Sequence, residues 1–266
     1  MAAGTSGARG TSAAGSKAPA KAGKPVRGKE TARSGATRIQ LLDAAERLFA
    51  EHGLENVTVR AIVARAGQKN ASALHYHFVD RDGLIRAIHL RRNAQVQARR
   101  TALVDGRLAM GSPPSLRDIC MLMVEPAFQL ACADAGFRRY IRAFSEWSAT
   151  TTMPAAKQLD IGLERGTLTS RALLRKALAH LDDALFARRF DSAVRFATLS
   201  MSVQARKPNA FRGPGAALFL ELLLDEMAGL LAAEVSPQTQ ATLAGTHERA
   251  THRPTAERSR QGTRKP

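Results

Sequence analysis

The chain has few cysteines, few aromatic residues and few acidic residues for its length. Only two cysteines occur in 266 residues, which excludes a disulfide scaffold and suits a reducing cytoplasm. Acidic residues number 23 against 40 lysines and arginines, and the resulting net charge of +17 favours an anionic partner. Hydrophobic residues nevertheless make up 44% of the chain, enough to form a buried core in one or two domains.

Long hydrophobic runs are also absent. The longest apolar stretch, residues 216–235, is interrupted by three acidic residues and is not a membrane span. Before Thr37 the only aliphatic side chains larger than alanine are Met1 and Val26, so this segment has neither a secretory signal nor the apolar face of a transit peptide. We therefore predict a cytoplasmic protein with no membrane partner.

Charge divides the chain into four segments. Residues 1–36 hold seven basic and one acidic residue, and residues 236–266 hold six and two. We interpret both as disordered basic tails that are simply solvated, with added nonspecific DNA affinity as the alternative. Residues 37–104 hold eleven basic and six acidic residues, whereas residues 105–235 hold sixteen and fourteen. This contrast predicts a nucleic-acid-binding module joined to a nearly neutral body.

Motifs for catalysis, cofactors and metals are absent or incomplete. Residues 23–29 match the phosphate-loop spacing, but Glu30 follows where that motif needs serine or threonine. His75 and His77 are two positions apart and would point to different sides of a helix, so they cannot share a metal. We therefore predict no enzyme activity, no metal site and no cofactor.

A helical pattern of apolar residues begins at Thr37, where a capping box predicts a first helix that ends at Gly53. Thr58 can cap a second, short helix that ends at Gly67, and Asn70 can cap a third over residues 70–78. Two short helices across a tight glycine turn predict a helix-turn-helix.

The outer face of the third predicted helix suits a DNA major groove. With Leu74 pointing inward, Ser72 and Tyr76 lie on the opposite side, flanked by His75. Small neighbouring residues would let the helix approach DNA closely, and these three side chains supply hydrogen-bonding groups for phosphates or base edges. No acidic residue lies on this face to repel phosphate. An ordinary helical hairpin is the alternative.

Several motifs follow one another in residues 58–88: a threonine at a helix start, an Ala-Gly turn, an aromatic-x-His-Phe signature and a basic residue. The residues that carry them are Thr58, Ala66, Gly67, Leu74, His77, Phe78, Arg81 and Leu84. In this order they resemble the N-terminal DNA-binding domain of TetR family transcriptional regulators. The resemblance extends from residue 37 to about residue 99, a quarter of the chain.

The resemblance and the surface argument together give a set of candidate DNA contacts. These residues are Thr58, Arg60, Lys69, Asn70, Ser72, His75, Tyr76 and Arg81. The resemblance implies phosphate contacts by Thr58, Arg60 and Arg81, and Lys69, Asn70 and Ser72 are candidates for groove contacts. His75 stands where the family commonly has a phosphate-contacting tyrosine, and either it or the adjacent Tyr76 fits that role.

A fourth helix is expected from Arg81 to about Val104, and in the resembled family it joins the DNA-binding domain to the effector domain. Four arginines follow its apolar start toward the far end: Arg91, Arg92, Arg99 and Arg100. We interpret them as a solvated basic face, with auxiliary DNA or interdomain contacts as the alternative.

Beyond residues 111–115 the apolar pattern is helical throughout, without strand-like alternation. Helices are expected near 115–133, 136–150, 155–165, 169–180, 181–206 and 215–234. The predicted fold is therefore all-α, with an N-terminal three-helix helix-turn-helix domain and a C-terminal helical effector-binding and dimerisation domain. In the resembled family the last two long helices pair with a second subunit. We therefore expect a homodimer with recognition helices about one DNA turn apart on a near-palindromic operator in double-stranded DNA.

Methionine and aromatic side chains concentrate in two adjacent helices of the body, as a cavity for an apolar ligand would require. The candidate pocket residues are Met123, Phe128, Cys132, Tyr140, Phe144 and Trp147. Plain core packing explains the same residues. We predict a DNA-binding regulator, a repressor released from its operator by a small-molecule effector. The alternatives are a TetR-like activator without a small-molecule ligand and a protein that coats nucleic acid nonspecifically.

Overall fold

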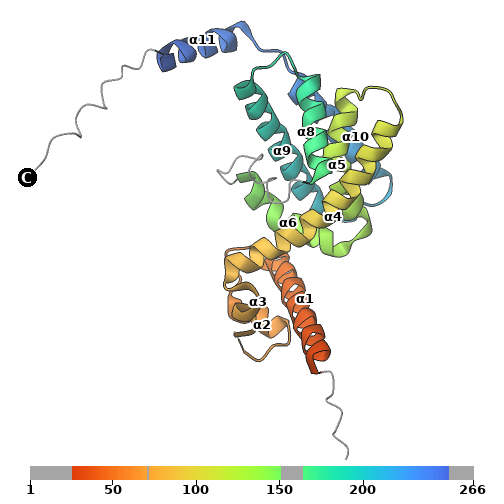
Figure 1. The fold of residues 1–266 in the computed structure, drawn as a ribbon, viewed down its shortest axis with the longest axis vertical. Coiled ribbons are helices and arrows are strands. Elements are labelled where there is room, and N and C mark those ends of the chain that lie inside the picture. Colours follow the sequence, from red (N-terminus) through yellow and green to blue (C-terminus); the bar gives the residue numbers. More distant parts are fainter. Residues whose placement is uncertain (1–25, 71, 151–163, 252–266) are drawn as a thin grey trace, which may run out of the picture.

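The computed structural model describes residues 26–70, 72–150 and 164–251, and no strand occurs among them (Figure 1). The helices are α1 (Val26–His52), α2 (Val59–Arg65), α3 (Ser72–Phe78), α4 (Arg81–Ala109), α5 (Leu116–Ala133), α6 (Ala135–Thr150), α8 (Arg165–Ala177), α9 (Asp183–Ala205), α10 (Gly213–Ala232) and α11 (Pro237–Thr251). The predicted all-α fold is confirmed for this part of the chain.

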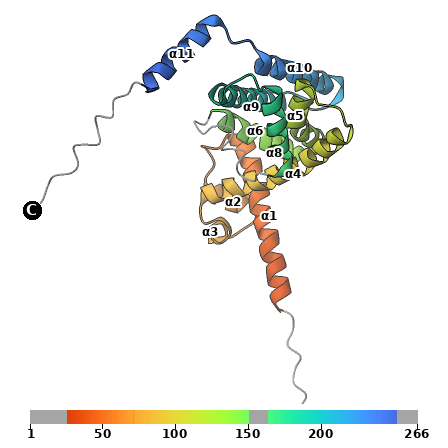
Figure 2. The same cartoon turned by 45° about the horizontal axis from the view of Figure 1, so that its top comes forward.

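Helices α1, α2 and α3 form a small bundle at one end of the molecule, and α4 runs from it into a larger helical body (Figures 1 and 2). The bundle core consists of apolar side chains from all three helices and from the start of α4, including Leu41, Phe49, Ile62, Leu74, Phe78 and Leu84. Thr58 caps α2 by accepting a hydrogen bond from the Ala61 amide at 3.2 Å. Gly67 has a φ of +69°, a conformation that favours glycine and turns the chain toward α3.

Helices α5, α6, α8, α9 and α10 surround the core of the body. An apolar stripe on α9 is buried at Phe186, Phe190 and Met201. The corresponding stripe on α10 is buried at Leu223, Met227 and Leu231. Burial of one apolar face on each helix is the main contribution to the stability of this layer.

Helix boundaries differ from the prediction at both ends of the chain. Helix α1 begins at Val26, directly after Pro25 in the sequence, so Thr37 lies inside the helix and does not cap it. Residues expected to belong to the C-terminal tail form α11, which extends away from the body (Figure 1). A capping serine followed by a proline, Ser236 and Pro237, explains why a helix starts there, and the Ser236 hydroxyl accepts from the Thr239 amide at 3.2 Å. Most of the helix expected over residues 155–165 lies outside the described residues.

Helix α6 belongs to both parts of the molecule. Its residues Phe137 and Ile141 are buried in the core of the body, whereas Ala143 and Phe144, on the next turn, are buried in the core of the α1–α3 bundle. One helix therefore contributes buried side chains to both cores, and its Phe144 ring contacts Phe49 of α1.

Candidate DNA-binding surface and effector cavity

The exposed face of α3 carries the side chains that the sequence places there. Ser72, His75 and Tyr76 are exposed, while Leu74 is buried against the bundle core. Tyr76 is 78% exposed, an unusual position for a large aromatic residue, and its only ring contact in the described residues is with the adjacent His77, with ring centres 4.9 Å apart. Among the other candidates, the side chains at the start of α2 and in the turn before α3 are also exposed: Thr58, Arg60, Lys69 and Asn70.

Asn70 has a structural role in addition to its predicted DNA contact. Its carboxamide oxygen accepts hydrogen bonds from the Ser72 amide at 3.0 Å and from the Ser72 hydroxyl at 2.9 Å. These bonds satisfy the first turn of α3, whose N–H groups have no partner within the helix. The amide nitrogen of Asn70 has no hydrogen bond within the described chain and can donate to DNA.

Arg81 and His75 are engaged within the protein. The half-buried Arg81 guanidinium donates to the Leu54 carbonyl and lies 5.5 Å from the centre of the Phe49 ring. The His75 ring pairs with the Val79 carbonyl at the end of α3. Arg81 therefore holds the loop before α2 against the start of α4, and its phosphate contact stays a prediction.

The interpretation of the α4 arginines as a solvated basic face is wrong for Arg92. Its side chain is buried and donates to both carboxylate oxygens of Glu46, at 2.9 and 2.5 Å, and to Asp134 at 2.9 Å. Arg91 donates to the same Glu46 at 2.7 Å and to Asp43 at 2.8 Å. Glu46 lies on α1 and Asp134 lies between α5 and α6. The cluster therefore joins the α1–α3 bundle to the body.

The interpretation is also wrong for Arg100, which is buried as well. The periodicity of α4 explains both corrections. Ile88, Arg92, Val96, Arg100 and Val104 follow one another at four-residue steps, so each lies beside the next in a continuous row along the helix. The four-residue spacing can therefore be detected in the sequence. Arginine side chains are usually exposed, however, so an interpretation based on residue type places Arg92 and Arg100 in solvent.

In the arginine cluster, the hydrogen bonds and charges of neighbouring groups outweigh the effect of burial on the pKa values. Burial alone would lower the pKa of Arg92, but the hydrogen bonds and charges of Glu46 and Asp134 raise it. Burial opposes ionisation of Asp134, yet its hydrogen bonds to the Gly136 amide and Arg92 lower the pKa of that carboxyl. A Cβ at Gly136 would lie 2.7 Å from the Arg92 guanidinium, so the packing favours glycine there. These closely packed ion pairs connect the α1–α3 bundle to the body. We call the group of Asp43, Glu46, Arg91, Arg92 and Asp134 the ionic joint.

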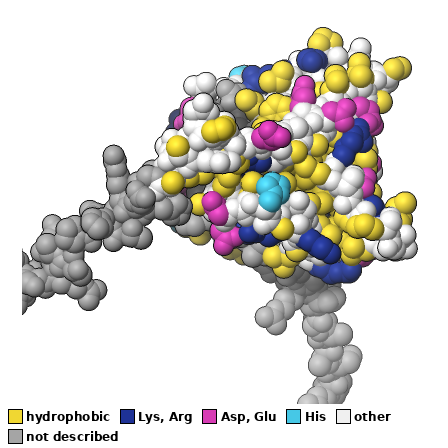
Figure 3. Space-filling view, turned by 90° about the horizontal axis from the view of Figure 1, so that it is seen from above, with side chains coloured by type: hydrophobic (Ala, Val, Ile, Leu, Met, Phe, Trp, Pro, Cys, Tyr) yellow, Lys and Arg dark blue, Asp and Glu magenta, His cyan; other side chains and the backbone are white. Residues whose placement is uncertain are grey.

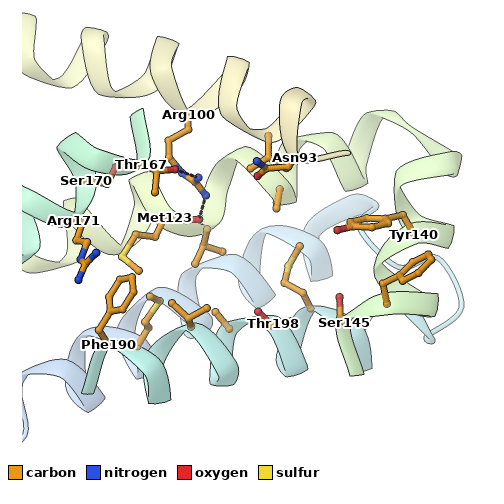
Figure 4. Close-up of a pocket in the computed structure, with 18 of the residues that line it drawn as sticks. Asn93, Arg100, Met123, Tyr140, Ser145, Thr167, Ser170, Arg171, Phe190 and Thr198 are labelled. Carbon is orange, nitrogen blue, oxygen red and sulfur yellow. Dashed lines mark hydrogen bonds between the residues drawn. The ribbon is translucent and has the colours of Figure 1, made fainter. Parts of the chain in front are cut away.

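A cavity of about 240 Å³ lies in the body between α4, α5, α6, α8, α9 and α10 (Figure 4). Three of the predicted pocket residues line it: Met123, Tyr140 and Phe144. Phe128 does not, because its ring packs against Phe211 and Phe219 beside α10.

Of the two remaining predicted pocket residues, only Cys132 can be compared with the cavity. Cys132 is exposed near the end of α5 and is not part of the lining. The side chain of Trp147 lies outside the described residues.

Sequence reasoning missed the polar part of the lining. Arg100 lines the cavity from α4, Thr167 and Ser170 from α8, and Thr198 from α9. Arg100, Thr167 and Ser170 lie on the side away from Tyr140 (Figure 4). Of these, only Arg100 had a detectable signal, its helical phase. The hydroxyl residues are common in surface helices and become informative only when the fold brings them together.

The aromatic end of the cavity touches the helices that support DNA binding. His89 on α4 lies 3.0 Å from the Tyr140 hydroxyl, and burial lowers the pKa of His89 to about 4. Burial also raises the pKa of Tyr140. The Phe144 ring, which lines the cavity, meets the Phe49 ring of α1 edge-on with centres 5.6 Å apart. Two side chains that line the cavity, Tyr140 and Phe144, therefore contact α4 and α1 directly.

Two kinds of feature are not found in the described part of the chain. None of its helices combines the length and apolar character needed to cross a membrane. No group of three or more histidine, cysteine, aspartate or glutamate residues in that part is arranged to hold a metal ion.

Comparisons with known proteins extend beyond the helix-turn-helix. The family described as bacterial regulatory proteins, tetR family, matches residues 41–88. The HTH-type transcriptional repressor Rv1474c of Mycobacterium tuberculosis is 31% identical over 156 residues, which cover 58% of this chain and 82% of that protein.

Two solved structures match part of the chain. One is the transcriptional regulator SCO7518 from Streptomyces coelicolor A3(2), with 23% identity, a TM-score of 0.40 and coverage of 74% of this chain and 99% of that chain. The other is the fatty acid degradation regulator FadR from Bacillus halodurans, with 17% identity, a TM-score of 0.42 and coverage of 74% and 95%.

Proposed function

The chain belongs to the tetR family of bacterial regulatory proteins and is a DNA-binding transcriptional regulator, and from this premise we propose that it is a homodimeric repressor released from its operator by a small-molecule effector. The observation that carries the effector role is the position of Phe144, which lines the cavity and is buried in the core of the α1–α3 bundle. DNA binding is assigned to the bundle, and effector binding to the body.

Release from DNA follows from the shared side chains. A ligand in the cavity would press on Tyr140 and Phe144, and therefore on His89 of α4 and Phe49 of α1. A small rotation of α4 changes the separation of the two recognition helices in a dimer, which favours a population unable to bind both half-sites. Effector binding then lowers the affinity for the operator, and operator binding lowers the affinity for the effector by the same factor.

Dimerisation is proposed through α9 and α10. Large hydrophobic side chains remain half-exposed on both helices: Leu199, Val203, Leu218 and Leu222. The end of the molecule opposite α2 and α3 also shows broad hydrophobic areas between scattered charges (Figure 3). Apolar surface of this kind supports association with a second copy, and a two-fold axis would match a near-palindromic operator.

Catalysis has no part in this proposal, and a regulator of this kind acts in the cytoplasm, where the DNA is. The alternative of activation is distinguished by a reporter gene placed behind the candidate operator. Deletion of the regulator raises reporter expression if the protein represses and lowers it if the protein activates.

Site-specific DNA binding is tested with DNA from beside the coding region of the protein, in competition with a shuffled sequence over a range of salt concentrations. We expect a preference for the native DNA that persists at physiological salt. The double change Ser72→Ala and Tyr76→Ala should abolish the preference, whereas Ser112→Ala, an exposed residue far from α3, should not. Equal binding of both DNAs, removed by salt, would instead identify a protein that coats nucleic acid nonspecifically.

A further inference from the structure

We propose that the effector is an apolar molecule with a carboxylate group, and that Arg100 binds this carboxylate in the cavity. The inference rests on the effector role proposed above and specifies its chemistry. It is carried by the position of one buried cation for which the described chain supplies hydrogen-bond acceptors but no negative charge.

Arg100 is fixed by three hydrogen bonds to neutral groups. Its guanidinium donates to the Leu122 carbonyl at 3.2 Å, to the Met123 carbonyl at 3.2 Å and to the Thr167 hydroxyl at 2.9 Å (Figure 4). A guanidinium carries five N–H groups, so these three bonds leave two that donate to no group in the described part of the chain. The side chain is 8% exposed and lines the cavity.

Part of this arrangement is structural. Pro126 lies inside α5 and has no N–H, so the Leu122 carbonyl four residues earlier loses its helical donor. The Arg100 Nε supplies the missing hydrogen bond. A neutral donor such as glutamine could do the same, however, so the helix repair explains the hydrogen bond and not the charge.

The charge of Arg100 is uncompensated within the described residues. Its lining partners include a second cation, Arg171, and no aspartate or glutamate. Arg92, eight residues earlier on the same face of α4, is equally buried but has Glu46 and Asp134 beside it. Burying a cation without a counter-charge is costly, which makes the absence of an acid here a functional feature.

Arg100 remains positively charged at the pH of the cell. Burial lowers its pKa to about 10, still well above neutrality. A carboxylate in the cavity would provide the missing counter-charge and accept the two remaining N–H bonds, the geometry in which arginine and carboxylate pair best.

The rest of the cavity defines the remainder of the ligand. Apolar side chains make up most of the remaining lining, including Val96, Phe137, Phe190 and Met201. A volume of about 240 Å³ suits a short alkyl or single-ring body. The ligand class is therefore a small monocarboxylic acid with an apolar body.

The test compares each acid with its neutral amide. Octanoate against octanamide and 4-phenylbutyrate against 4-phenylbutyramide differ chiefly in charge, and calorimetric titration of the full-length protein measures the affinity of each. We expect at least one acid to bind about tenfold or more tightly than its amide, as one charge-assisted pair provides. No binding of either acid, or equal binding of acid and amide, would overturn the inference.

Two variants localise the effect. Arg100→Gln keeps a donor for the Leu122 carbonyl and should abolish the preference for acid, with circular dichroism confirming the native helix content. Arg99→Gln removes the neighbouring cation of α4, which does not line the cavity, and should preserve the preference. A preference that survives in folded Arg100→Gln would contradict the assignment. If Arg100→Gln does not fold, the acid and amide comparison on the unchanged protein still decides the ligand class.

Effector function is measured separately by release of bound operator DNA. An acid that binds through Arg100 without releasing DNA would support the carboxylate site and contradict the proposed repressor mechanism. Release of DNA by a neutral compound that does not need Arg100 would support the mechanism and contradict the carboxylate site.

Discussion

Glu46 is the single residue on which the ionic joint depends. It is 2% exposed and lies between Arg91 and Arg92, so its removal leaves two cations without their shared partner. We predict that Glu46→Gln lowers the free energy of unfolding by about 3 kcal/mol. Urea denaturation at neutral pH measures this change.

Asp43 provides the matched control for that measurement. It contacts the same Arg91, but its side chain is 47% exposed, and solvent screens the pair. Asp43→Asn should lower the unfolding free energy by no more than about 1 kcal/mol. Similar losses in the two variants would mean that the joint is only a surface feature.

His89 makes the stability depend on pH. Burial lowers its pKa to about 4 in the folded chain, whereas the unfolded chain binds the proton below about 6.5. The unfolded state therefore binds more protons in this range, and the stability present above pH 6.5 is lost as the pH falls toward 4. Between pH 7.5 and pH 5 the loss from this group should be about 2 kcal/mol.

Denaturation of the wild-type chain and of His89→Gln at both pH values isolates this contribution. The variant has no titrating group at this position, so its unfolding free energy should fall by about 2 kcal/mol less than that of the wild-type chain over the same range. Parallel losses in the two proteins would show that His89 is accessible to protons in the folded state.

At the level of elements, α2 and α3 could be predicted well from sequence because their signals are local. Thr58 as a cap, Gly67 as a turn and the buried Leu74 all act within a few residues. The start of α1 could not be located, because a threonine with capping chemistry at Thr37 is equally compatible with a helix that continues back to Val26.

The role of α4 depended on contacts distant in sequence. Nothing near Arg92 indicates that Glu46 and Asp134, each more than forty residues away, supply its counter-charge. Spacing placed the side chain on the inner face, but only tertiary packing shows which acids meet it. The same limit applies to the cavity, whose polar wall comes from three separate helices.

The cap of α3 gives a prediction at this scale. Asn70→Ala removes the acceptor for the Ser72 amide and should lower the unfolding free energy by about 1 kcal/mol. Asn70→Asp keeps an acceptor there and should retain stability, but it adds a negative charge beside DNA and should weaken operator binding. Comparison of denaturation with DNA titration separates the two roles, and unchanged DNA affinity of Asn70→Asp would remove Asn70 from the binding surface.

For the whole molecule, the proposed function requires a second copy, because one recognition helix would read only half of a near-palindromic site. The half-exposed leucines of α10 are the proposed centre of that contact. We predict that Leu218→Glu combined with Leu222→Glu produces a monomer at micromolar concentration in sedimentation velocity, because each association would bury two carboxylates per subunit without partners.

Operator affinity of this double variant should fall by at least about a hundredfold, since the gain from linking two half-site contacts is lost. Leu108→Glu, which introduces the same charge at an equally exposed leucine of α4, should remain dimeric and bind the operator normally. A double variant that still sediments as a dimer would locate the interface elsewhere. A monomer with undiminished operator affinity would show that one copy suffices, and would remove the spacing of two recognition helices as the means of effector control.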